Sequence, residues 1–148
     1  MRHLCDSNLL IAATVDSHLH HAEARRWLQS LKKTDTAALC RASQTSFLRL
    51  LTLKPVMGED VLDNSRAIAL AQSLLLNPGF EFIAGEPPDL EADWLRMAEA
   101  DHPAPKTWMD AYLAAFAIGF SLRFVTFDRA FERFRKDGLD LLLLPPGT

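Results

Sequence analysis

The sequence is poor in the features that mark specialised proteins. It has two cysteines, Cys5 and Cys40, and neither belongs to a CxxC pair. This argues against a zinc site with four clustered ligands and is usual for reduced core residues. No apolar run reaches the length of a membrane span, and Asp6 stands where a signal peptide needs apolar residues. We therefore expect a cytoplasmic protein with no membrane association.

The chain also lacks an excess of either charge. Its 16 Lys and Arg residues against 19 Asp and Glu give a formal net charge of −3. This argues against a protein that binds nucleic acid mainly through bulk charge. It does not exclude a nuclease, in which carboxylates lower the net charge while a local basic rim contacts the phosphates. With 49% hydrophobic residues, a chain of 148 residues suits a single globular domain spanning 1–148.

Short β-like runs alternate with longer helical ones along the whole chain. The runs predicted as strands are 3–5, 36–40, 80–83, 123–127 and 139–144. The segments predicted as helices are 9–14, 18–31, one opening at Ser43 or Thr45 and ending before Pro55, 61–76, 88–100, 108–120 and 129–136. This order predicts an α/β fold of three layers, with a parallel sheet of about five strands and helices on both faces.

Three aspartates occupy positions suited to a shared site. Asp6 ends the first predicted strand, Asp128 ends the strand 123–127, and Asp110 lies in the first turn of the helix 108–120. Functional groups of parallel sheets gather at the carboxyl ends of the strands. Carboxylates at an apolar rim repel one another unless a positive group lies between them, and Mg²⁺ or Mn²⁺ prefers such oxygen ligands. The spacing alone leaves open a simpler interpretation, in which Asp6 and Asp128 cap helices.

Four segments resemble the signature blocks of PIN-domain ribonucleases, most closely the VapC-type toxins of bacterial type II toxin–antitoxin pairs. They read LCDSNLLIA at 4–12, FLRLLT at 47–52, WMDAYLA at 108–114 and VTFD at 125–128. The resemblance covers nearly the whole chain in the right order. It implies a PIN-like fold, Mg²⁺- or Mn²⁺-dependent cleavage of RNA, an antitoxin that silences the enzyme, and a homodimer.

The resemblance also implies roles for individual residues. Asp6, Asp110 and Asp128 are expected to bind the metal or to position its ligands, and the Thr126 hydroxyl to position water or phosphate. The family usually supplies a glutamate on the helix after the second strand, but the segment 41–47, RASQTSF, contains no acid. Depending on the alignment, Gln44 or Ser46 stands at that position. We take Gln44 as the substitute, which accepts hydrogen bonds but brings no charge.

Two alternatives remain open at this point. The missing glutamate is consistent with a PIN-fold binding module whose catalysis has weakened. Another metal-dependent phosphohydrolase is the second alternative. A phosphoenzyme mechanism, however, favours a second acid two residues after Asp6, where Asn8 stands. The sequence offers no Ser-His or Cys-His arrangement for nucleophilic catalysis.

Other residues have both a functional and a structural interpretation. His18, His20 and His21 resemble metal ligands, although they open a helix where polar residues are common. Trp108 and Tyr112 could stack on bases or lie in the core, and Trp27 and the run 74–76 could meet an antitoxin or pack internally. The basic residues that could contact RNA phosphates are Arg41, Arg49, Lys106, Arg123, Arg129 and Arg133.

Overall fold

The computed structural model describes residues 1–146 and contains one sheet of five strands in the order β3-β2-β1-β4-β5. The strands are β1 (Arg2–Cys5), β2 (Thr36–Cys40), β3 (Phe80–Ile83), β4 (Arg123–Thr126) and β5 (Asp140–Leu143). Every neighbouring pair is parallel. The predicted α/β fold with a parallel sheet of five strands is confirmed.

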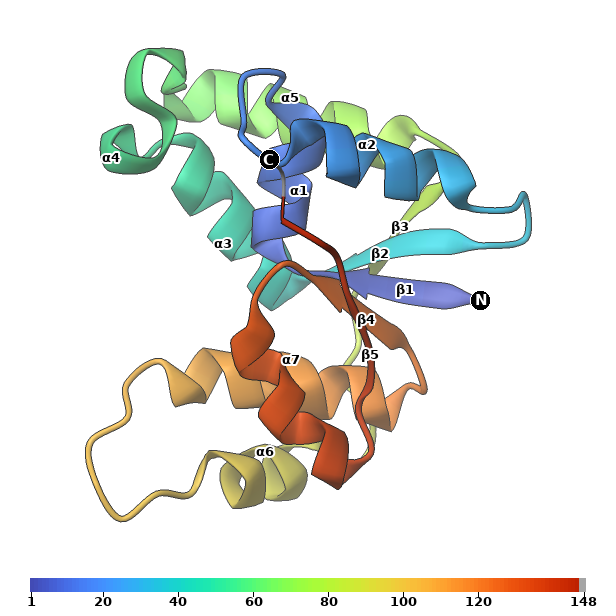
Figure 1. The fold of residues 1–148 in the computed structure, drawn as a ribbon, viewed down its shortest axis with the longest axis vertical. Helices are drawn as coiled ribbons and strands as arrows, with labels where there is room; N and C mark the ends of the chain where they lie inside the picture. Colours follow the sequence, from blue (N-terminus) through green and yellow to red (C-terminus); the bar gives the residue numbers. More distant parts are fainter. Residues whose placement is uncertain (147–148) are drawn as a thin grey trace.

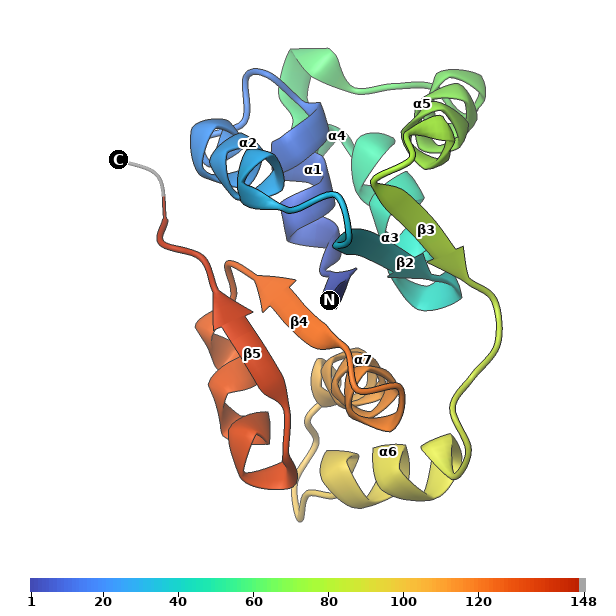
Figure 2. The ribbon, with the colours of Figure 1, turned by 90° about the vertical axis from the view of Figure 1, so that its right-hand side faces the viewer.

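Helices cover both faces of the sheet, as Figures 1 and 2 show. On one face lie α1 (Ser7–Thr14), α2 (His21–Ser30), α3 (Arg41–Leu51) and α5 (Asn64–Leu76). On the other lie α6 (Leu90–Ala98), α7 (Thr107–Gly119) and the 3₁₀ segment η2 (Arg129–Asp137). Because successive strand residues point to opposite faces, Leu4 packs into the second layer and Cys5 into the first.

The middle of the sheet is where the strand order reverses. From β1 the chain builds outward through β2 and β3, then returns to place β4 on the other side of β1. In the register of this pair, Cys5 lies beside Val125. Asp6 and Asp128 therefore follow the carboxyl ends of two adjacent strands, at the topological switch point where ligands bind in open α/β sheets.

Some predicted boundaries were wrong. The third helix begins at Arg41, and Ser43 lies inside its first turn, where its hydroxyl accepts from the Cys40 N–H at 2.9 Å. The same helix ends at Leu51, before Pro55 as predicted. We did not predict the short helix α4 (Lys54–Met57) that follows, with Pro55 in its first turn, where a missing N–H costs little, or the 3₁₀ turn η1 (Gly58–Asp60) after it.

Beyond its exposed first turn, helix α7 is apolar on nearly all sides, and this part of it is enclosed. Its middle, Leu113 to Ala117, is buried between α6 and the sheet. None of the helices within residues 1–146 has the length and hydropathy that crossing a bilayer requires.

Candidate active site

Asp6 is a carboxylate buried at the end of β1. Only 8% of the residue is exposed. One carboxylate oxygen accepts a hydrogen bond from the Ser7 N–H at 2.8 Å, and the other accepts from the Thr126 hydroxyl at 2.7 Å. Burial raises the pKa of Asp6 to about 6, these two hydrogen bonds oppose the rise, and the negative charges of Asp110 and Asp128 add to it.

The Thr126 side chain joins the two strand ends. Its hydroxyl donates to Asp6 and accepts from the Asp128 N–H at 2.9 Å and from Asn8 Nδ2 at 3.2 Å. The Phe127 N–H donates to Asn8 Oδ1 at 3.4 Å. This network fixes the first turn of α1 against the end of β4. Sequence reasoning assigned Thr126 to the site but missed Asn8, whose partners are 118 and 119 residues away.

Asp110 reaches the same edge from the first turn of α7. Its carboxylate accepts from Arg133 Nη2 at 3.1 Å in an ion pair. Partial burial raises the pKa of Asp110, with the charge of Asp128 acting in the same direction, while the cations Arg133 and Lys106 oppose the rise. Burial therefore outweighs the two nearby cations in its effect on the pKa of Asp110.

Asp128 is the N-cap of η2, because its carboxylate accepts from the Ala130 N–H at 2.9 Å. Asp6 likewise caps α1. The capping interpretation of both residues is therefore correct, but it does not exclude a shared site. A capping carboxylate uses one oxygen on the helix, and its charge still acts on the neighbouring acids.

The three carboxylates are close enough to perturb one another, yet they are not gathered into a tight cluster. Within residues 1–146 no group of three His, Cys, Asp or Glu side chains is arranged closely enough to hold a metal ion. Asp110 is already paired with Arg133. The chemistry of the donor set nevertheless suits a divalent cation. Burial and like charges raise the pKa of Asp6 to about 6, and a nearby positive charge would favour its ionised form.

Gln44 makes no described contact with these acids. It lies in the first turns of α3, and its side-chain carbonyl accepts a hydrogen bond from Arg41 Nη1. Ser46 has no described hydrogen bond to the acids either. The structure thus brings Asp6, Asp110, Asp128 and Thr126 to one edge, while the role predicted for Gln44 stays a prediction.

The other candidates divide between core and surface. Within residues 1–146 the histidines form no metal cluster, and His21 is held by the Ala12 carbonyl at 2.7 Å. Trp27 is a core residue. The Tyr112 hydroxyl donates to Glu86 at 2.6 Å, whereas Trp108 is 55% exposed.

The basic residues also divide, between those near the acids and those far from them. Arg123 pairs with Asp140 at the start of β4, at the opposite edge from the acids. Arg133 lies within the candidate site.

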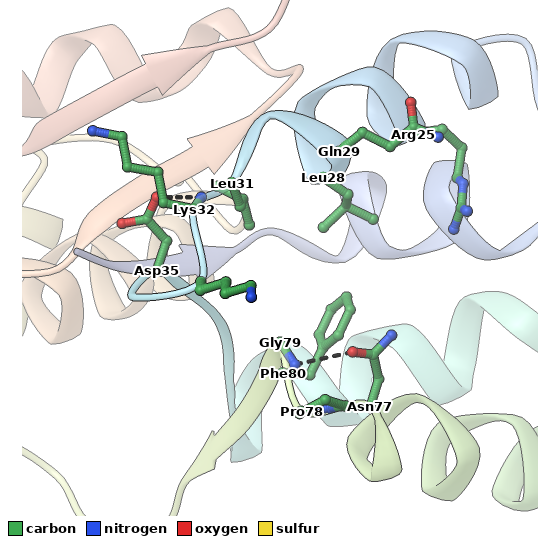
Figure 3. A pocket seen from close by; sticks show the side chains of 11 residues that line it. Arg25, Leu28, Gln29, Leu31, Lys32, Asp35, Asn77, Pro78, Gly79 and Phe80 are labelled. Carbon is green, nitrogen blue, oxygen red and sulfur yellow. Dashed lines mark hydrogen bonds between the residues drawn. The ribbon is translucent and has the colours of Figure 1, made fainter.

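The most spacious cavity among those described is not part of this site. It has a volume of about 450 Å³ and lies between α2, the loop before β2 and the turn before β3. Figure 3 shows Leu28 and Phe80 within it, Arg25 at one end, and Lys32 with Asp35 at the other. Because β2 and β3 begin here, the cavity lies at the amino ends of the strands, opposite the acids.

Comparison with known proteins identifies the fold family. The profile of the family described as PIN domain matches residues 4–137. The chain belongs to the PIN domain family. This PIN-domain chain is 40% identical over 144 residues to "Ribonuclease VapC41" of Mycobacterium tuberculosis (strain ATCC 25618 / H37Rv), a match covering 95% of the chain and 97% of that protein. With "Ribonuclease VapC44" of the same strain it shares 29% identity over 130 residues, which is 88% of each protein.

Two solved structures illustrate the shared fold. A chain of VapBC2 from Rickettsia felis, crystallised with a DNA fragment from its promoter, matches with a TM-score of 0.69 at 15% identity, covering 98% of this PIN-domain chain and 100% of that chain. Mycobacterium tuberculosis VapC20, described as a Sarcin-Ricin loop cleaving toxin, matches with a TM-score of 0.63 at 17% identity, covering 88% and 93%. At these identities the likeness shows the fold.

Proposed function

We propose that this chain is an endoribonuclease of the VapC type, the toxin of a toxin–antitoxin pair, which hydrolyses RNA phosphodiesters. The convergence of Asp6, Asp110 and Asp128 at the switch point between β1 and β4 is the observation that carries the proposal. The 40% identity to a protein named as a ribonuclease, over nearly its whole length, supports the same activity.

Asp6, Asp110 and Asp128 would hold a divalent cation, Mg²⁺ or Mn²⁺. Such a cation lowers the pKa of water and neutralises charge on a scissile phosphate. The fit rests on the donor set, because these oxygens are the ligands that hard cations prefer and two of the three acids have raised pKa values.

The remaining residues orient these acids. Thr126 holds one oxygen of Asp6, and Asn8 holds the Thr126 hydroxyl, so the Asp6 carboxylate has a fixed direction. Arg133 places a positive charge beside Asp110, where a substrate phosphate needs a partner. Preorganised charge of this kind is a large part of catalysis at phosphate centres.

The proposed partners follow from the same family. The structure of VapBC2 from Rickettsia felis and that of VapBC-1 from nontypeable Haemophilus influenzae share this fold. We propose a cognate antitoxin that silences this chain. A homodimer and a cytoplasmic location stay predictions.

Cleavage of a mixed RNA pool tests the proposal. The purified chain is incubated with Mn²⁺, with Mg²⁺ and with EDTA, beside the variant Asp6→Asn and the matched control Asp16→Asn, whose side chain is fully exposed. We expect cutting that EDTA abolishes, that Asp6→Asn lowers by about 100-fold or more, and that Asp16→Asn leaves unchanged. Thermal melts show that each variant is folded.

The alternative is a PIN-fold binding module, and the Gln44–Arg41 hydrogen bond favours it because no carboxylate stands there. Folded, antitoxin-free chain that binds RNA but cuts none of the pool under either metal would support this alternative against the nuclease.

A further inference from the structure

A small recess lies directly beside the acidic site. It is bounded by the loop between α6 and α7 and by one side of η2, and Thr107, Arg133, Phe134 and Lys136 are among its lining residues. Thr107 and Asp110 are three residues apart on α7 and so share a helix face. Arg133 connects the two places, since it lines the recess and pairs with Asp110 at 3.1 Å. We call this hollow the α6–α7 recess.

Arg133 is held in a defined orientation. Its guanidinium carbon lies 4.7 Å from the centroid of the Phe134 ring, which is itself buried. The hydrogen bond to Asp110 uses one of the several N–H donors of a guanidinium, and the side chain is still 42% exposed. A planar cation fixed at two points with spare donors is well suited to a phosphate.

The other charges of the α6–α7 recess leave Lys136 as the available cation. Lys136 is exposed and has no ion pair within residues 1–146, whereas His102 lies 3.1 Å from Asp101. Two carboxylates, Glu99 and Asp137, also line the recess, but Asp137 is already paired with Arg96 at 3.1 Å.

The volume limits what can bind. The α6–α7 recess measures about 220 Å³, below the roughly 300–1,000 Å³ of pockets that enclose a drug-sized ligand. It suits part of a longer chain, such as one phosphate with its sugar, better than a complete small molecule.

We infer that the α6–α7 recess binds the RNA backbone next to the scissile bond, with Arg133 and Lys136 contacting a phosphate of the neighbouring nucleotide. This inference rests on the proposed ribonuclease function and assigns a substrate contact to that site. Phosphate contacts set the register of a nucleic acid without reading its sequence. The α6–α7 recess would therefore fix which bond of a bound strand lies over the three acids.

Salt-dependent binding tests the inference without any cleavage. A fluorescent single-stranded RNA of mixed sequence is titrated in EDTA with the parent chain, Arg133→Gln and Lys136→Gln, over a range of salt concentrations. Each lost phosphate contact lowers the slope of log K against log salt by about 0.7, which near 0.1 M salt is a loss of about fivefold in affinity. Arg133→Lys keeps the charge and should restore most of the slope.

The matched control is Arg25→Gln, which removes an exposed arginine from the cavity at the opposite edge of the sheet (Figure 3). We expect it to bind like the parent. Equal slopes for the parent and all three Gln variants would overturn the inference. An equal decrease of the slope in all three variants would overturn it too, because the effect would then come from bulk charge.

A cleavage assay with the parent separates the two hypotheses. If the parent cuts RNA while the recess variants bind normally, only the inference fails. If the folded parent neither binds nor cuts RNA, the proposed function fails and the inference fails with it.

Discussion

Asp6→Asn should make the protein more stable at alkaline pH while removing its activity. Burial and the neighbouring acids raise the pKa of Asp6 from its ordinary value of 3.8 to about 6. The folded state therefore holds this proton more tightly than the unfolded chain does. For a raised carboxyl pKa, stability falls as pH rises through the window from about 4 to 6, and the full cost is present above it. Asparagine has the same shape without the charge.

The size of the effect follows from the pKa values. At about 1.4 kcal/mol for each pKa unit, the ionised Asp6 costs about 3 kcal/mol near pH 8 and about 1 kcal/mol near pH 4.5. Asparagine can still accept from the Ser7 N–H, but its NH₂ group replaces an oxygen that accepts from Thr126. That loss costs about 1 kcal/mol. We expect the two proteins to be nearly equal near pH 4.5 and about 2 kcal/mol apart near pH 8, with the variant more stable.

Urea denaturation in EDTA at several pH values measures this difference, and thermal melts should show a rise of roughly 4–8 °C near pH 8. Asp16→Asn serves as the control, because it removes one carboxylate at a fully exposed position outside the site. A gap between parent and Asp6→Asn that stays constant from about pH 4.5 to 8 would refute the reasoning. If the site binds Mn²⁺, adding it should narrow the gap by stabilising the parent.

Three further predictions test separate parts of the structure. Thr126→Val keeps the volume but removes the hydroxyl that donates to Asp6 and accepts from the Asp128 N–H. It should lower the free energy of unfolding by about 1–3 kcal/mol, and Thr126→Ser should lower it much less. Gln44→Glu should lower the Mn²⁺ concentration for half-maximal cleavage by about tenfold, and a larger effect of Ser46→Glu would assign the missing glutamate to position 46 instead. No effect of either would contradict the idea that its loss weakens metal affinity. Gly119→Ala should destabilise the fold by about 1–3 kcal/mol in urea although alanine favours helices, because a Cβ there would lie 2.6 Å from Pro87. Gly85→Ala, which meets nothing within 4 Å, is its control.

The sequence was informative where local pattern and topology agree. The strands over 36–40 and 80–83 have the predicted bounds, because apolar runs bounded by turn residues leave little choice. Parallel strands bring their carboxyl ends to one edge, so Asp6 and Asp128 could be placed together before any coordinates. Asp110 was a candidate from its position in the first turn of a helix, but the family resemblance strengthened it most, since its spacing does not say which sheet edge that helix start approaches.

The contacts that complete the site could not be predicted in the same way. Asn8 follows Asp6 by two residues, but its hydrogen bond to Thr126 depends on a pairing of β1 with β4 that no local pattern encodes. Arg133 is one basic residue among several in η2, and only the packing of η2 against α7 selects it as the partner of Asp110. Pro55 correctly indicated that the preceding helix had ended, but the short helix that begins beside it was missed, because proline is favoured in the first turn of a helix as well as after its end.

Asp6 and Asp128 have two roles with opposite effects on stability, namely capping a helix and carrying negative charge. Asp6 and Asp128 are helix caps, a role that an asparagine could fill as well and without charge. What asparagine cannot supply is negative charge, and in Asp6 that charge is buried beside two other acids at a cost of about 3 kcal/mol near neutral pH. A structural role alone gives no reason to keep such a cost. A cation entering the site would offset this cost, which is why the donor set fits the divalent cation proposed above.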